Sequence, residues 1–161
     1  MKPTEYSEYP LILVIARVFM LSAIVITGLI ITYNSIILVY SYLFLVIFIL
    51  FFTVLFVCRF CCYFGKLCDK GFGKLAKLIF KYHLVDYKKF QFYGNICTVL
   101  IIIFLLFPVI YGVVLSVTTF DKMNIGLTVL SLLLGTVYIA TQQFISCPHC
   151  AMNKYCGIYV K

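Results

Sequence analysis

The chain has 161 residues, of which 65% are hydrophobic and 11% charged, and its mean hydropathy of +1.13 lies above the range of soluble globular domains. A membrane bundle of this length leaves no room for a separate soluble domain, so we expect a single domain, residues 1–161. The net charge is +8, but the basic residues gather in a segment beside lipid, which argues against nucleic acid as a partner.

Long stretches without a charged side chain divide the chain, at 18–58, 90–120 and 123–153. A charge at the bilayer centre costs about 2.5–3.5 kcal/mol, and a helix crosses the hydrocarbon core with about 20 residues. The first stretch is too long for one helix and contains the polar pair Asn34-Ser35, which predicts a helical hairpin. We therefore expect an all-α membrane protein with four transmembrane helices, at about 11–32, 36–57, 92–117 and 125–145.

The N-terminal residues lack the basic region of a signal peptide, so we expect the first span to remain as an uncleaved anchor. Between the second and third spans, the linker 59–89 carries eight basic side chains against Asp69 and Asp86. The positive-inside rule places such a linker in the cytosol. The prediction is two membrane hairpins, with both termini cytoplasmic and a cytosolic cysteine-rich tail, 146–161.

Arg17 is the one charge inside a predicted span. One interpretation is an arginine whose long stem lets its guanidinium reach the headgroups. The other is a buried charge paired with polar groups on neighbouring helices, such as Gln142, Gln143 or Asn95. Since no acidic residue lies inside any predicted span, a proton or cation relay lacks its usual carboxylate, which argues against a transporter.

The linker shows helical periodicity over 66–82. An apolar series and a lysine series, each with spacings of three and four residues, predict a basic amphipathic helix lying in the headgroup plane. The alternative is a solvated connector whose lysines only set the topology. The residues expected to contact anionic lipid headgroups are Lys66, Lys70, Lys74, Lys77 and Lys81, and the apolar series is Cys68, Phe72, Leu75, Ile79 and Tyr82.

Cysteines cluster at the predicted cytoplasmic ends of the second and fourth spans, and the reducing cytosol makes structural disulfides unexpected. S-acylation (palmitoylation) is the first interpretation, because cysteines at the foot of a membrane helix are its usual sites. The candidates are Cys58, Cys61 and Cys62.

The segment Cys147-Pro148-His149-Cys150 supports two further interpretations. Two cysteines at this spacing grip one tetrahedral zinc ion, and Cys61, Cys62, His149 or Cys156 would complete the site. A single such pair is a weak signal for zinc. The tetrapeptide also resembles the active site of thioredoxin-fold disulfide oxidases, but a membrane span precedes it here and only a short tail follows. The expected cofactor is therefore none, with zinc as the alternative.

The order of features resembles the small four-span Golgi proteins of the COPI-associated, Tvp15-like family. The similarity lies in Arg17 early in the first span, in the runs 35–56 and 125–139, and in the aromatic segment 87–95 that leads into the third span. The family's Gly-Arg-Gly-like element at the third span is replaced by Gly94-Asn95. The resemblance implies a trafficking-associated Golgi membrane protein without catalytic residues.

Three functions follow from these features. The first is a non-enzymatic multi-pass membrane protein of the Golgi or ER, acting in vesicle-mediated transport, in membrane organisation or as a small subunit of a membrane complex. Its expected partners are the lipid bilayer, other membrane proteins and coat components. The second is a cysteine-cluster membrane enzyme or zinc-binding protein. The third is a small oligomeric channel or transporter.

Overall fold

The computed structural model describes residues 8–33, 35–82, 85–119 and 122–152, and the elements within these ranges are all helices. Asn34 and the tail residues 153–161, Cys156 included, lie outside the described residues. The α-helices are α1 (Leu11–Thr32), α2 (Ile36–Phe52), α3 (Phe72–Ile79), α4 (Tyr87–Thr119) and α5 (Lys122–Thr141).

Two of the long helices end in the same unusual way. A π-helical turn extends α2 over Thr53–Val57 (η1), and a 3-10 turn follows at Cys58–Phe60 (η2). The end of α5 repeats this sequence of turns with Gln142–Ser146 (η3) and Cys147–His149 (η4). Single π turns inside helices are rare and are frequently found at functional sites.

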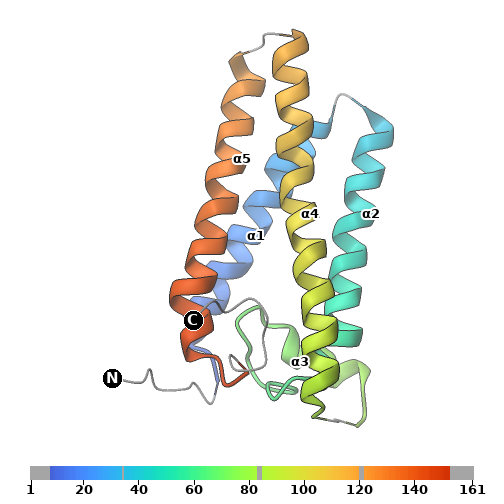
Figure 1. The fold of residues 1–161 in the computed structure, drawn as a ribbon, viewed down its shortest axis with the longest axis vertical. Coiled ribbons are helices and arrows are strands. Elements are labelled where there is room, and N and C mark those ends of the chain that lie inside the picture. The colour runs from blue at the N-terminus through green and yellow to red at the C-terminus, as the bar shows by residue number, and fades with distance from the viewer. Residues whose placement is uncertain (1–7, 34, 83–84, 120–121, 153–161) are drawn as a thin grey trace.

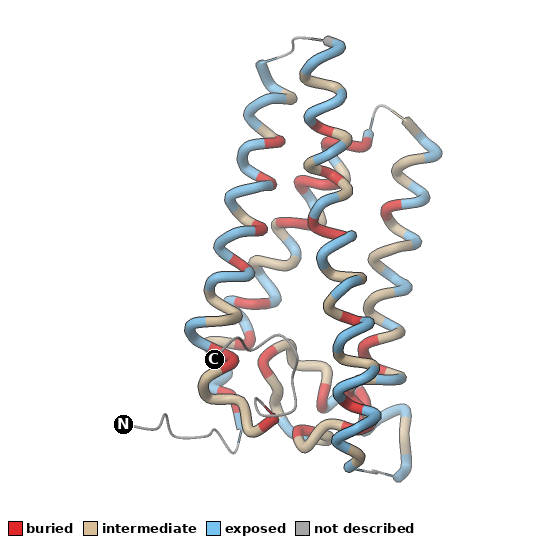
Figure 2. Tube along the Cα trace, viewed as in Figure 1, coloured by how far each residue is buried: buried red, intermediate tan, exposed pale blue. Residues whose placement is uncertain are grey.

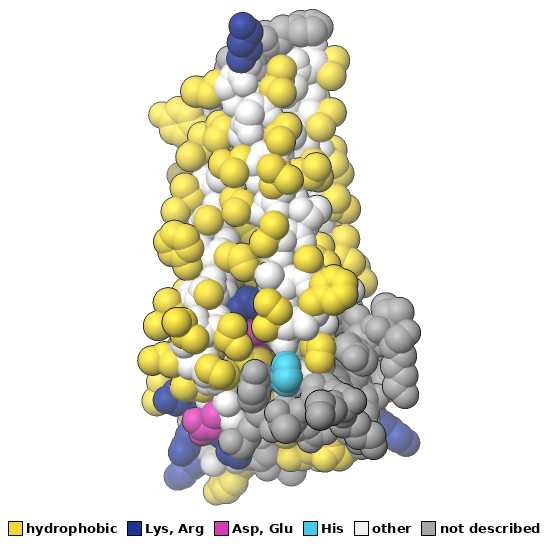
Figure 3. Space-filling model, turned by 90° about the vertical axis from the view of Figure 1, so that its left-hand side faces the viewer, with side chains coloured by type: hydrophobic (Ala, Val, Ile, Leu, Met, Phe, Trp, Pro, Cys, Tyr) yellow, Lys and Arg dark blue, Asp and Glu magenta, His cyan; other side chains and the backbone are white. Residues whose placement is uncertain are grey.

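Four helical segments of the described chain are long and apolar enough to cross a membrane: Leu11–Thr32, Ile36–Phe60, Tyr87–Thr118 and Lys122–His149. Only 22–33% of the most apolar window of each is buried inside the protein. Figure 3 shows hydrophobic side chains covering most of the visible face of the bundle. An exposed apolar surface of this extent fits lipid and not water. The all-α, multi-pass membrane character predicted from the sequence is therefore confirmed.

The long helices form an elongated bundle in which α4 and α5 lie side by side and α1 packs against α2, α4 and α5 (Figure 1). α1 ends and α2 begins at the same end of the bundle where α4 ends and α5 begins (Figure 1). We name the opposite end, where α3 and the segments 58–71 and 142–152 lie, the closed end.

The apolar core lies between the long helices and is organised around Tyr42 of α2, which is fully buried. Its ring stacks on Phe104 of α4 with centroids 5.4 Å apart, and its hydroxyl donates to the Ile24 carbonyl oxygen at 3.4 Å. Gly28 of α1 makes this possible, since a Cβ there would collide with the Tyr42 ring. The buried positions follow the inner sides of the helices and gather at the closed end (Figure 2).

The linker differs from the prediction, because the amphipathic helix expected over 66–82 is only the eight-residue α3, Phe72–Ile79. Residues 61–71 instead form a loop of successive turns, which we name the 61–71 loop. The loop ends at Gly71, whose φ of 76° lies in the left-handed region that favours glycine and stops a helix from continuing backwards. The periodic spacing of apolar residues and lysines over 66–82 does not reveal this interruption.

α3 packs closely on the 61–71 loop through Gly73, whose N–H faces the Cys68 sulfur at 3.3 Å and whose carbonyl accepts a 2.9 Å bond from Gly65. A Cβ at position 73 would collide with the backbone carbonyls of Tyr63 and Lys66. The outer side of α3 exposes both apolar and basic residues, Lys74, Leu75, Lys77, Leu78 and Ile79.

Candidate functional site

Arg17 lies at the centre of a buried polar network at the closed end, with only 5% of its surface exposed. Its Nη1 donates to the Tyr138 carbonyl oxygen at 2.9 Å, and its Nη2 donates to Ser146 Oγ at 2.8 Å. The guanidinium also lies over the Tyr138 ring, 5.2 Å from its centroid. The interpretation of Arg17 as a headgroup-reaching side chain is therefore wrong, because the guanidinium is held inside the protein.

The partner of the Arg17 charge is Asp69, which the 61–71 loop carries into the bundle end. The Arg17 Nε lies 3.4 Å from Asp69 Oδ1, and Ser146 Oγ donates to the same oxygen at 2.6 Å. Asp69 is 8% exposed. A buried charge is tolerated when it is paired and hydrogen-bonded, and this arrangement meets both conditions.

The predicted partners of Arg17 are not the ones it uses. Asn95 is exposed on α4, whereas Gln142 and Gln143 line a small cavity next to the network. Sequence reasoning missed Asp69 because it lies outside every span and only the fold of its loop brings it inside. Once Asp69 is counted, the closed end does contain a carboxylate.

A second set of bonds ties the N-terminal segment to this network. The Tyr9 hydroxyl donates to the Ser146 carbonyl oxygen at 2.8 Å, and the Tyr9 N–H donates to the Leu67 carbonyl oxygen at 3.0 Å. Burial raises the pKa of the Tyr9 hydroxyl well above its usual range, and burial also raises the pKa of Tyr63 to about 12. Both phenols therefore stay neutral at physiological pH, where the Tyr9 hydroxyl donates to Ser146 and the Tyr63 hydroxyl accepts from the Ala151 N–H at 3.1 Å.

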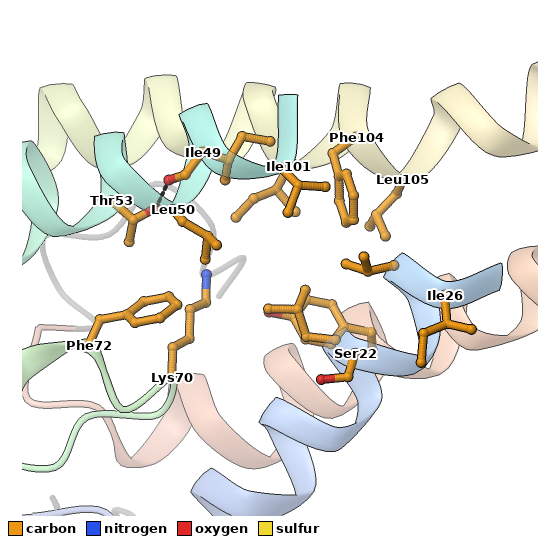
Figure 4. A pocket seen from close by; sticks show the side chains of 14 residues that line it. Ser22, Ile26, Ile49, Leu50, Thr53, Lys70, Phe72, Ile101, Phe104 and Leu105 are labelled. Atoms are coloured by element: carbon orange, nitrogen blue, oxygen red, sulfur yellow. Dashed lines mark hydrogen bonds between the residues drawn. The ribbon is translucent and has the colours of Figure 1, made fainter. Parts of the chain in front are cut away.

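Lys70 follows Asp69 but does not share its ion pair. Its side chain reaches into the interior and lines three neighbouring cavities of about 290, 150 and 140 Å³. Figure 4 shows the side chain rising from the loop with its nitrogen beside Leu50. This position departs from the prediction, which grouped Lys70 with the headgroup-facing lysines. Lys66, Lys74, Lys77 and Lys81 are exposed.

Each of the turns η2 and η4 begins with one cysteine and is followed by another, which gives two pairs with the same spacing, Cys58/Cys61 and Cys147/Cys150. In each pair the second N–H donates to the carbonyl of the first cysteine, at 3.3 and 3.2 Å. All four line the 150 Å³ cavity. The sequence analysis did not identify Cys58 and Cys61 as a second pair with the spacing of Cys147 and Cys150, although this spacing is visible in the sequence.

Their chemistry depends on their surroundings. Cys58 and Cys147 are buried, whereas Cys61, Cys62 and Cys150 are partly exposed. A hydrogen bond with Cys62 and burial raise the pKa of the Cys61 thiol well above its usual range. A protonated thiol is a poor nucleophile and a poor metal ligand until it loses its proton. Within the described residues, no three His, Cys, Asp or Glu side chains are placed to hold a metal ion together.

The chain matches no protein-family model, and neither the curated proteins nor the solved structures include one that is significantly similar to it. The class of protein is therefore defined by its own architecture: an all-α membrane protein with four helices long and apolar enough to span the bilayer and a buried Arg17–Asp69 pair at one end. The resemblance to the COPI-associated family stays a prediction.

Proposed function

We propose that the chain is a non-enzymatic multi-pass protein of Golgi or ER membranes, acting in membrane trafficking or organisation or as a small subunit of a membrane complex. In this proposal the two hairpins span the bilayer and the closed end, with both termini, faces the cytosol. The basic side chains of the linker support this orientation through the positive-inside rule.

The observation that carries the proposal is how the charged groups at the closed end are used. Arg17, Asp69 and Ser146 bond to one another and lie buried, so they hold the 61–71 loop against the helices. Buried groups that bond to one another in this way stabilise the fold, whereas a catalytic acid or base must reach a substrate.

The outer side of α3 supports contact with a membrane surface. Leu75, Leu78 and Ile79 are exposed next to the exposed Lys74 and Lys77. A short helix with this composition, held at the end of a membrane bundle, lies in the headgroup region and attracts anionic lipid.

Affinity purification in a mild detergent tests the proposal. Co-purification of coat or tethering proteins supports a trafficking role, and a stoichiometric large complex supports a subunit role. Recovery of a homogeneous homo-oligomer that conducts ions in planar bilayers would contradict both and favour the channel alternative.

A second candidate, a metal-binding or cysteine-dependent protein, rests on the two cysteine pairs that line one cavity. Four thiolates from two such pairs are the ligand set of structural zinc sites, but these side chains would have to move closer together to hold one ion, since within the described residues no three of them are placed to do so. Metal analysis of protein purified without chelators tests it: stoichiometric zinc, lost on replacing Cys58 and Cys147 with serine, supports this candidate. Zinc far below stoichiometry, in protein that is folded, counts against it.

A further inference from the structure

Lys70 brings a second positive charge into the closed end, beside the Arg17–Asp69 pair. Its neighbour Asp69 is already paired with Arg17 and accepts from Ser146. Among the described residues, the Lys70 ammonium makes no hydrogen bond or ion pair. The set of Arg17, Asp69 and Lys70 therefore brings one net positive charge into the closed end. Lys70 is half-buried, and a partly desolvated cation without a direct ion-pair partner is unfavourable, so an anion bound beside it would lower this cost.

The cavity that Lys70 enters has two chemically different parts. At the closed end lies the ammonium, while the remaining walls come from α1, α2, α4 and α5 and are almost entirely apolar, as at Val25, Ile49 and Phe104. The hydroxyl of Thr53 in this wall already donates to the Ile49 carbonyl, at 2.7 Å (Figure 4). A ligand that fills this space must therefore have one anionic end and a hydrocarbon body.

The position of the other polar groups decides where the anionic end would lie. Asp69 Oδ2 and Gln142 Oε1 are buried acceptors that have no hydrogen-bond partner among the described residues, and they would repel an anion. Both residues line the smaller cavities, and neither lines the 290 Å³ cavity. An anion beside Lys70 is therefore favoured in the large apolar cavity.

The cavity borders the outer surface of the bundle, which faces lipid in the proposed orientation. Its wall includes Ser22 and Ile26 of α1, and both are exposed on the outer surface of the helix, Ile26 by 57%. A volume near 290 Å³ lies at the lower limit of small-molecule sites, which begin at about 300 Å³. This size and the single ammonium suit one acyl chain with one negative charge better than a two-chain phospholipid.

We propose that this cavity binds a long-chain fatty acid from the membrane, with its carboxylate on Lys70 Nζ and its hydrocarbon chain between α1, α2 and α4. The bound carboxylate completes the charge balance of the closed end. Lys70 is thus a ligand-binding residue, whereas the exposed lysines of the linker face the membrane surface.

The test uses the full-length protein in phosphatidylcholine nanodiscs, with palmitate, hexadecanol and dioleoyl phosphatidate as probes and native mass spectrometry as the readout. Wild-type protein is expected to bind one palmitate and to bind hexadecanol at least about tenfold more weakly, since the alcohol lacks the charge. Equal binding of the two would overturn the proposal. Tighter binding of phosphatidate, with displacement of palmitate, would overturn the assignment to a single-chain ligand.

Variants locate the site. Lys70→Met keeps the length of the side chain without its charge and is expected to weaken palmitate binding by about tenfold or more. Lys122→Met, at an exposed position where α5 begins at the opposite end of the bundle (Figure 1), is the matched control and is expected to change it by less than about twofold. Leu50→Trp places a larger side chain beside the Lys70 nitrogen (Figure 4), where it obstructs the cavity, and is expected to weaken palmitate binding by about tenfold or more while Lys70 remains. Unchanged binding in Lys70→Met or in Leu50→Trp overturns the proposal. If Lys70→Met does not fold, Leu50→Trp and the comparison of palmitate with hexadecanol still test whether the cavity binds a fatty acid.

Discussion

Replacing Asp69 with asparagine should destabilise the protein strongly, because it removes the counter-charge of a buried arginine. The side chains of Arg17 and Asp69 are only 6% and 11% exposed, so solvent screens this pair little. Removing one partner of a buried ion pair typically costs about 3–5 kcal/mol. Arg17 keeps its bonds to Tyr138 and Ser146 in this variant. We therefore expect a loss near the lower limit, about 3 kcal/mol, which lowers the folding equilibrium constant more than a hundredfold.

The assay is reversible unfolding in bicelles by steric trapping or by titration with a denaturing detergent. Arg17→Met should cost a similar amount, and the double variant should cost less than the sum by about 1–3 kcal/mol, because neither charge is then left alone. Asp86→Asn is the matched control, since the Asp86–Lys89 pair is exposed and its loss should change stability little. If Asp69→Asn is as mild as Asp86→Asn, or if the two single changes simply add, the pair does not hold the closed end together.

Two further predictions concern packing. Gly73→Ala should lower the free energy of unfolding by about 1–3 kcal/mol, because the new Cβ collides with the backbone carbonyls of Tyr63 and Lys66. Gly126→Ala is the control, since its new Cβ lies in open space, and it should leave stability unchanged or slightly raised. Thermal unfolding in detergent measures both. Tyr42→Ala should lower the free energy of unfolding by about 3–5 kcal/mol, because it leaves a cavity in the core. Tyr42→Phe should lower it by about 1 kcal/mol, because it removes only one hydrogen bond. Similar losses of stability in the two variants would show that the ring contributes little.

The spans were predictable because the bilayer imposes a simple rule on them. The first helix runs from Leu11 to Thr32, as predicted. The prediction rested on the absence of charge beyond Arg17 and on the length that a helix needs to cross the hydrocarbon core. The other three begin or end a few residues away from the prediction, since helices continue past the hydrocarbon core. The π and 3-10 turns after α2 and α5 were not predicted, because they depend on the packing of the closed end.

The candidate site was less accessible to sequence reasoning. Arg17 stood out as a charge in a span, but its partner comes from a loop whose path depends on Gly71 and Gly73. Lys70 shares its spacing with Lys66 and Lys74, and only the three-dimensional fold of the loop separates it from them. Local periodicity describes a single helix and carries no information on which loop folds back into a bundle.

The most direct test is hydrogen–deuterium exchange of the full-length protein in lipid nanodiscs. In the structure the 61–71 loop is folded into the end of the bundle, where its amides at Phe64, Lys66 and Gly71 donate to loop carbonyls at 3.1, 3.0 and 2.9 Å. We expect slow exchange at these amides, as in the spans, and faster exchange in Asp69→Asn. Exchange in the wild-type loop as fast as in an unstructured peptide, while the spans stay protected, would show that the loop is not folded into the bundle.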